Sequence, residues 1–324
     1  MIRTIANLLS PAGRNGRLSI LIFHRVVAQR DPVFDWNPDA IAFERRMRWL
    51  RTWFHVLPLD EAVRRLREQS LPARAAAVSF DDGYADNYHV ALPILQRLGI
   101  PATFFVATGY IDGGRMWNDT IAESVRHCGK DTLDLSGIGL GRHDISSPET
   151  MRRTTAVLLD GLKYKAARER RQAADHVAQV AGCRLPADLM MTSEQVQAMH
   201  RAGMQIGAHT VSHPILAGLD HDEVRREVVG SRDFLEDLLQ DRVGLFAYPN
   251  GRPSLDYRAE DADSVRALGF DAAVTTAWGV ADAGSDLMQL PRFTPWDGTR
   301  LRFGVRLLRN LLDDSRRAST QMAG

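Results

Sequence analysis

The chain has 324 residues, of which 44% are hydrophobic and 25% are charged, and its formal net charge at pH 7 is +1. These fractions are typical of an ordinary globular protein. A net charge this close to zero excludes a global electrostatic field that would recruit nucleic acid. The two cysteines, Cys128 and Cys183, are too few and too scattered for a disulfide framework or a thiolate metal site.

We interpret residues 1–17 as an N-terminal extension. Its apolar stretch, residues 5–9, is interrupted by Asn7 and is too short for the hydrophobic region of a secretory signal. No window of the sequence approaches the ~18 consecutive apolar residues that a membrane span requires. We therefore expect a cytoplasmic protein.

Short apolar runs recur along the chain and alternate with stretches of helical pattern. The predicted strands are 18–23, 54–57, 75–80, 102–107, 204–208, 244–247, 270–275 and 288–290. The predicted helices between them are 39–51, 59–69, 88–98, 193–202, 222–240 and 259–268. Most strand runs are continuously apolar, which indicates strands buried on both faces.

This alternation predicts a parallel sheet with right-handed crossovers. Seven or eight such units favour a barrel over an open sheet, so we expect an α/β fold: a distorted (β/α) barrel of about seven to eight parallel strands over residues 18–298. Residues at about 113–190 break the alternation. They are rich in arginine and mostly helical, with a loop-like stretch at 137–148. We predict that they form a helical insertion over one mouth of the barrel.

The third predicted strand ends in Ser79-Phe80-Asp81-Asp82-Gly83. Consecutive strand residues point to opposite faces, so two adjacent carboxylates do not normally share a site. Gly83 permits a sharp turn, which would let both carboxylates face the mouth of the barrel. The alternative is an ordinary Asp-Gly turn in which Asp82 caps the next helix.

A second motif, His209-Thr210-Val211-Ser212-His213-Pro214, follows the predicted strand 204–208. Two histidines four residues apart fall on one side of a helical turn or tight loop. With one carboxylate they make a three-ligand metal set that leaves positions open for water and substrate. We expect Thr210 and Ser212 to orient the rings. The alternative is two surface histidines around a turn, but both motifs end strands where α/β barrels place catalysis.

Together these elements resemble those of the polysaccharide deacetylases of the NodB homology class (carbohydrate esterase family 4), over roughly residues 18–294. The resemblance implies that Asp81 is the catalytic base and that Asp82, His209 and His213 hold a divalent metal, usually zinc, with cobalt or nickel also accepted. It implies hydrolysis of the N-acetyl group of an amino-sugar polysaccharide or lipid-linked glycan. The expected partner is therefore an N-acetylated glycan or glycolipid, with no nucleic acid.

The sequence departs from the family pattern where that pattern usually reads Arg-x-Pro-Tyr-Gly. Here it reads Ala247-Tyr248-Pro249-Asn250-Gly251, so the arginine that orients the base is missing. Arg252 or Tyr248 are candidate replacements. We predict that Tyr248, Pro249 and Asn250 contact the substrate, and the alternative is a simple turn.

A second departure concerns the general acid, because Arg292 stands where the family usually has a late histidine. Arginine stays protonated and cannot donate a proton and recover it, so we predict that Arg292 binds substrate or stabilises Asp81. His24 ends the first predicted strand and is our candidate general acid, with a buried structural histidine as the alternative. This placement resembles the poly-β-1,6-N-acetylglucosamine deacetylase branch. Trp117 is predicted to stack on a sugar ring, and core packing is equally compatible with it.

Residues 299–324 form a basic C-terminal segment whose first part is amphipathic. Phe303, Leu307 and Leu311 fall at helical spacing, and arginines occupy another face. We predict an amphipathic helix that either contacts the inner face of a membrane peripherally or packs on the barrel.

Two alternatives to a deacetylase stay open: a deformylase of a lipid-linked amino sugar, and a catalytically weak glycan-binding barrel. The oligomeric state is not predicted.

Overall fold

The computed structural model describes residues 1–313 of the chain. Within these residues a seven-stranded sheet has the order β1-β3-β4-β7-β8-β9, and β2 pairs with the start of β3. All pairings in this sheet are parallel, as predicted. The strands are β1 Leu18–Phe23, β2 His55–Val56, β3 Ala75–Phe80, β4 Thr103–Val106, β7 Gln205–Ala208, β8 Leu245–Ala247 and β9 Ala272–Val274.

The gap between the last and first strands is closed by an irregular segment. The predicted strand 288–290 is wrong, because Leu287–Gln289 form a 3-10 turn that begins where the Asp286 side chain accepts a hydrogen bond from the Met288 N–H. The following residues then bridge to both edges: Leu290 pairs with Val274 in β9, and Phe293 pairs with Leu21 in β1. The sheet is therefore curled into the predicted barrel-like form.

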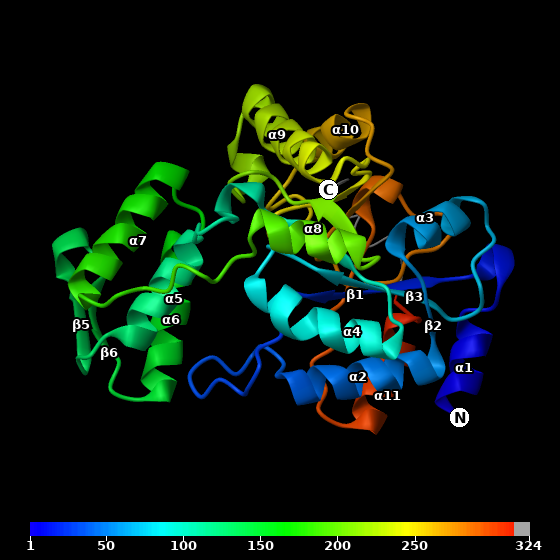
Figure 1. Ribbon diagram of the computed structural model, residues 1–324, viewed down its shortest axis with the longest axis horizontal. Coiled ribbons are helices and arrows are strands. Elements are labelled where there is room, and N and C mark those ends of the chain that lie inside the picture. The colour runs from blue at the N-terminus through cyan, green and yellow to red at the C-terminus, as the bar shows by residue number, and fades with distance from the viewer. Residues whose placement is uncertain (314–324) are drawn as a thin grey trace.

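Helices surround the sheet on the outside (Figure 1). Outside the insertion they are α1 Ile2–Leu9, α2 Ala40–Trp53, α3 Leu59–Arg67, α4 Leu92–Leu98, α8 Ser193–Arg201, α9 His221–Leu239, α10 Ala259–Ala267 and α11 Arg300–Asn310. Helix α3 packs differently from the other helices. Its Leu59, Val63 and Leu66 belong to the same hydrophobic cluster as the strand residues that face into the barrel.

Side-chain alternation along β3 determines what points into the barrel. Ala75 and Ala77 belong to the inner cluster, whereas Ala76, Val78 and Phe80 pack in the outer layer against the helices. Because the period of a strand is two residues, the next inward position is Ser79, and the one after it, just past the end of the strand, is Asp81.

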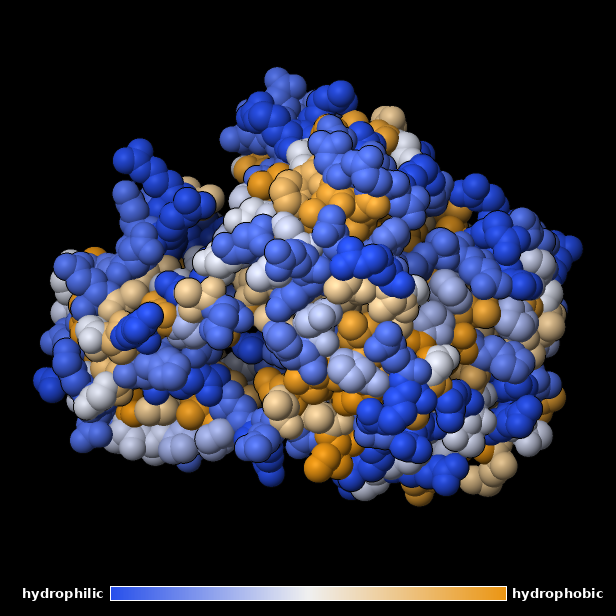
Figure 2. All heavy atoms as spheres, viewed as in Figure 1, coloured by the Kyte–Doolittle hydropathy of each residue, from blue (hydrophilic) through white to orange (hydrophobic). Residues whose placement is uncertain are grey.

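The insertion stands to one side of the barrel and has its own hydrophobic core (Figure 1). It consists of α5 Trp117–His127, β5 Thr132–Leu135, β6 Gly141–Asp144, α6 Pro148–Leu162 and α7 Ala167–Ala181. Part of the stretch predicted as loop is strand β6, which pairs with β5 in an antiparallel hairpin. Its sequence, Gly-Arg-His-Asp, has no apolar alternation and therefore gave no strand signal. Figure 2 shows a furrow between the insertion and the barrel.

The C-terminal helix α11 packs on the barrel beside α1 and α2. Its apolar stripe, Phe303, Leu307 and Leu311, is fully buried in the core. Gly304 permits this packing, since a Cβ there would collide with the Ile2 side chain. The predicted membrane contact through this stripe is therefore wrong, because the barrel already covers it. Residues 314–324 of the predicted tail lie outside the described residues, and among residues 1–313 no helix is long and apolar enough to cross a membrane.

Candidate active site

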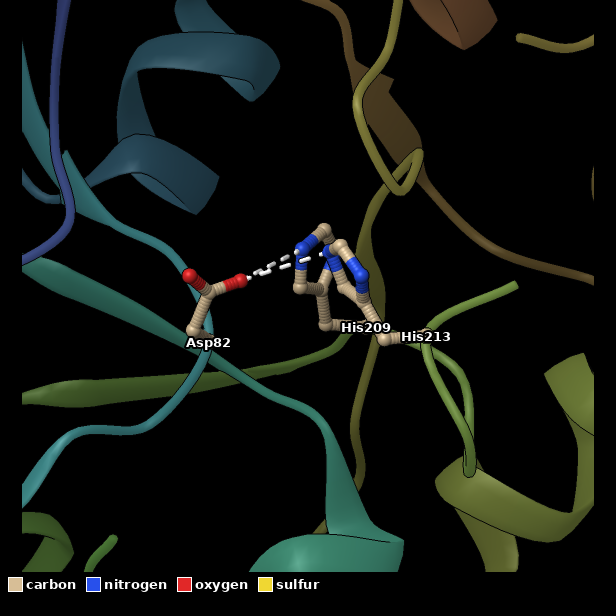
Figure 3. Close-up of side chains that lie close together, drawn as sticks. All are labelled: Asp82, His209 and His213. Carbon is tan, nitrogen blue, oxygen red and sulfur yellow. Dashed lines mark ion pairs between the residues drawn. The ribbon is translucent and has the colours of Figure 1, made fainter. Parts of the chain in front are cut away.

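Three predicted metal ligands converge at the C-terminal ends of the strands. Asp82 follows β3, His209 follows β7, and His213 lies in the loop after His209 (Figure 3). The Nε2 atom of each histidine lies 3.4 Å from Oδ1 of Asp82. One ligand atom from each residue lies within 4.8 Å of the others. This is the two-imidazole, one-carboxylate set that a divalent cation accepts while keeping open positions.

At this site three residues other than glycine adopt left-handed backbone conformations. The φ angle is +81° at Asp82, +65° at Thr210 and +52° at His213. Each such residue costs on the order of 1–3 kcal/mol and persists where the surroundings impose it, often at functional sites. The sharp turn expected at Gly83 therefore begins one residue earlier. It directs Asp82 toward the histidines instead of the face that strand alternation would give it.

The ring of His209 is oriented by a backbone carbonyl. Its Nδ1–H donates to the Ala247 carbonyl oxygen at 2.7 Å, which directs Nε2 toward Asp82. Thr210 and Ser212, predicted to orient the rings, hold the loop instead. The Thr210 hydroxyl accepts from the His213 N–H at 3.1 Å, and the Ser212 hydroxyl donates to Glu227 at 2.6 Å.

The charges at the site favour ligation of a cation. Burial lowers the pKa of His213 to about 4, so its imidazole is neutral at pH 7, as a metal ligand must be. Burial alone would raise the pKa of Asp82, but the hydrogen bond with His209 outweighs it and holds that pKa below its usual value. The group is therefore an anionic carboxylate next to imidazole nitrogens, which fits a divalent metal ion.

Beside this set, Asp81 is bound by Arg292 inside the barrel. Nη1 and Nη2 of Arg292 donate to the two carboxylate oxygens of Asp81, each at 2.7 Å. The Arg292 side chain is fully buried and also donates from Nε to the Thr275 carbonyl at 2.8 Å. Burial would raise the pKa of Asp81, but the charges of Arg292 and His209 outweigh it and lower that pKa. Asp81 is therefore an ionised carboxylate held in a fixed orientation.

Comparison with known proteins identifies the family. A family model described as polysaccharide deacetylase matches residues 68–273. The chain belongs to the polysaccharide deacetylase family. Among curated relatives, YxkH of Bacillus subtilis (strain 168) is 23% identical over 278 residues, which are 85% of this chain and 70% of that protein. The poly-β-1,6-N-acetyl-D-glucosamine N-deacetylase of Staphylococcus aureus (strain N315) is 34% identical over 78 residues, covering 24% of this chain and 27% of that enzyme.

Solved structures agree with the fold. The Streptococcus pyogenes deacetylase PplD in complex with acetate superimposes with a TM-score of 0.60 at 22% identity, over 91% of this chain and 98% of that one. IcaB from Ammonifex degensii gives a TM-score of 0.58 at 18% identity, over 92% and 98%. At these identities the likeness shows the fold alone, and it confirms the predicted barrel.

In this deacetylase three of the predicted substrate contacts, Arg292, Tyr248 and Pro249, need correction because they are buried. Arg292 is fully buried and paired with Asp81, which agrees with the second of its two predicted roles, so it orients Asp81 and does not contact substrate. Tyr248 is also fully buried: its hydroxyl donates to the Met288 carbonyl at 2.9 Å and its ring stacks on Tyr257. Pro249 is buried beside it. Arg252, the other candidate replacement, instead donates to the Tyr164 hydroxyl and pairs with Asp256.

The remaining predicted residues lie near the ligands. Asn250 and Trp117 line one cavity of about 210 Å³ together with His213. His24 follows β1 with an exposed side chain, and its charge contributes to lowering the pKa of both Asp81 and Asp82. The deacetylase thus holds a candidate base beside the three ligands and a candidate acid at the end of the neighbouring strand β1.

Sequence reasoning missed a buried polar chain that joins the insertion to these loops. Arg25 forms an ion pair with Asp86 at 2.6 Å and lies over the Tyr84 ring, 4.8 Å from its centroid. The Tyr84 hydroxyl donates to Asp119 of α5 at 3.0 Å. Arg25 follows His24, and Tyr84 lies two residues after Asp82. The insertion is therefore tied to both halves of the site, a relationship that no local pattern reveals.

Proposed function

We propose that the chain hydrolyses the N-acetyl group of an amino sugar in a polysaccharide or a lipid-linked glycan, and that the reaction depends on a divalent metal, most commonly zinc. The observation that supports this proposal is the placement of the Asp81–Arg292 pair beside the cluster of Asp82, His209 and His213. Membership of the polysaccharide deacetylase family supports the substrate class. A relative named for an N-acetyl-D-glucosamine polymer supports an amino sugar.

A cation bound by Asp82, His209 and His213 would polarise the acyl oxygen and lower the pKa of a water molecule. Asp81 is the group that takes the proton from the attacking water. Its two oxygens each accept one hydrogen bond from Arg292, and each retains another lone pair for a water. Arg292 thereby fixes the direction of the base and keeps it ionised.

The leaving group of an amide is an amine, which departs only when its nitrogen is protonated as the C–N bond breaks. We assign the donation of this proton to His24, whose charge contributes to lowering the pKa of both Asp81 and Asp82. A positioned acid of this kind contributes roughly 10²–10⁴ in rate.

The test is acyl release by the purified full-length chain after loading with zinc. Acetate is measured with β-1,4-linked and β-1,6-linked N-acetylglucosamine oligomers, and formate with N-formyl analogues. We expect acetate release that falls by at least about 10²-fold in Asp81→Asn, because the base is lost. Asp60→Asn, an exposed carboxylate at the start of α3, is the matched control and should keep the wild-type rate.

Equal rates for wild type and Asp81→Asn would contradict the proposal and favour a glycan-binding barrel. Release of formate without acetate would replace it with a deformylase.

A further inference from the structure

Arg170, near the start of α7, is a buried cation without an acidic partner. Its side chain is 7% exposed, and among residues 1–313 no carboxylate lies within ion-pair distance of it. Nη1 donates to the Lys163 carbonyl at 2.9 Å, Nε is buried without any hydrogen bond, and the guanidinium lies over the Trp117 ring. Burying a charge without a counter-charge is costly, so an unpaired arginine in this position calls for an explanation.

Three cavities share Arg170, and all lie where the insertion meets the barrel. One of them, about 210 Å³, is also lined by the metal-ligand candidate His213 and by Asn250 and Lys163. Arg170 therefore lines a cavity that reaches the site of the reaction.

The charge around these cavities is strongly biased, although the whole chain is nearly neutral. Their cationic lining residues are Arg115, Lys163, Lys165, Arg170, Arg171 and Arg258, and their acidic ones are Asp160 and Asp175. None of these six cations forms an ion pair within the described part of the chain. Clustered cations lining a cavity focus a positive potential and attract anions.

We propose that Arg170 and Lys163 form an anion-binding subsite that recognises a phosphate or carboxylate group carried by the substrate next to its N-acetyl sugar. This inference rests on the proposed function, because it specifies the substrate class of the same site. The guanidinium of Arg170 offers paired N–H donors that match the oxygens of either anion, and Lys163 adds a point charge. Because His213 and Arg170 line the same small cavity, the anion lies on or beside the sugar that is deacetylated.

The experiment measures dissociation constants of the zinc-loaded, full-length chain for three N-acetyl sugars. They are N-acetylglucosamine 1-phosphate, the carboxylate sugar N-acetylmuramic acid, and the neutral methyl glycoside of N-acetylglucosamine. We expect at least one anionic sugar to bind about tenfold or more tightly than the neutral one. Preference for the phosphate points to a lipid-linked or phosphorylated sugar, and preference for the carboxylate points to an acidic sugar.

Lys163→Gln and Arg170→Gln should each reduce this preference to within about threefold, with the affinity for the neutral sugar unchanged. Arg168→Gln is the matched control, because Arg168 is exposed on the same helix and lines none of the three cavities. Since Arg170 also bonds to the end of α6, its variant is checked by thermal unfolding, and Lys163→Gln decides the question if that variant is unfolded.

Equal affinity for all three sugars, or a preference that survives both substitutions, would overturn the subsite. Acetate release from neutral oligomers is scored separately. Turnover without anion preference would refute the subsite and keep the deacetylase. Arg170-dependent anion binding without any acyl release would support the subsite and refute the proposed deacetylase activity.

Discussion

Asp81 and Arg292 form a two-point ion pair inside the barrel although they are 211 residues apart in sequence. Asp81 ends the inward-facing row of β3, and Arg292 lies in the irregular segment that joins β9 to β1. The same segment therefore closes the barrel and orients the proposed base. Loss of the guanidinium should affect both stability and the protonation of Asp81.

Replacing Arg292 with glutamine should destabilise the fold and shift the pH dependence of activity. The free energy of unfolding should fall by roughly 3–5 kcal/mol, the usual cost of leaving one buried charge unpaired. Because Arg292 lowers the pKa of Asp81, the pair stabilises the fold above the ordinary pKa of an aspartate, and this stabilisation is lost as the pH falls through the lowered value. Without Arg292 the pKa of Asp81 rises, so the acidic limb of the kcat/KM profile moves to higher pH.

Arg252→Gln serves as the control for this substitution. Arg252 is an exposed arginine paired with Asp256, and its loss should not shift the acidic limb of the kcat/KM profile. If Arg292→Gln lowers kcat/KM equally at every pH, its role is structural and does not act through the protonation of Asp81.

Removal of metal should destabilise the chain through the three converging ligands. A cation that binds only the folded chain stabilises it by about 2.7 kcal/mol at a hundred times its dissociation constant. Adding zinc to chelator-stripped protein should therefore raise the Tm by several degrees, as measured by thermal unfolding. His209→Gln should abolish this rise, because it removes one of three ligands. His200→Gln, at a half-buried histidine of α8 outside the ligand cluster, should retain it, and a rise in both variants would place the zinc elsewhere.

Most of the barrel could be predicted because its strands carry strong local signals. The runs at β1 and β3 are fully buried and apolar except for one serine each, and the structure reproduces both predicted ranges. The clustering of Asp82, His209 and His213 was also predictable, since each motif lies directly after such a strand. The closing segment was not, because Leu290 and Phe293 each make a single bridge around Pro291 and have no strand periodicity.

Arg292 illustrates a different limit of sequence reasoning: its pairing with Asp81 was one of two predicted roles, but its position in the fold was not predicted. Arg292 follows Leu290 by two residues, and Leu290 faces the inner cluster, so alternation would have pointed Arg292 inward had the closing segment been placed correctly. The amphipathic pattern of α11 was read correctly, but a pattern cannot distinguish a membrane from another part of the same chain. Only tertiary packing shows that α1 and α2 cover its apolar stripe.

Asp119 should make stability decline with rising pH. Burial raises its pKa from the usual 3.8 to about 7. Between these values the folded chain binds a proton that the unfolded chain has released, so folding is increasingly disfavoured as the pH rises. Asp119→Asn removes this titration. From about pH 5 to about pH 8 the variant should gain roughly 2–3 kcal/mol in unfolding free energy relative to wild type.

Urea unfolding at the two pH values measures this difference, with Asp131→Asn as the control, because Asp131 is an exposed carboxylate of the same insertion. A constant difference between Asp119→Asn and wild type at both pH values would show that Asp119 is ionised throughout.

The packing of α11 is tested by two leucines of the same helix. Leu307 is fully buried, and Leu307→Ala should lower the free energy of unfolding by roughly 2–5 kcal/mol through lost burial and a residual cavity. Leu301 is 62% exposed, and Leu301→Ala should change the free energy of unfolding by less than about 0.5 kcal/mol. Urea unfolding distinguishes them. Equal small effects would mean that α11 is detached from the barrel in solution.

The role of His24 is tested by the choice of leaving group. His24→Gln should lower kcat on an N-acetylglucosamine oligomer by roughly 10²–10⁴, because the departing amine needs a proton. With 4-nitrophenyl acetate the leaving phenolate is stable without protonation, so the same variant should hydrolyse this ester at nearly the wild-type rate. Asp81→Asn should impair both reactions, since both need an activated water. If His24→Gln slows the amide and the ester equally, His24 positions other groups and the general acid lies elsewhere.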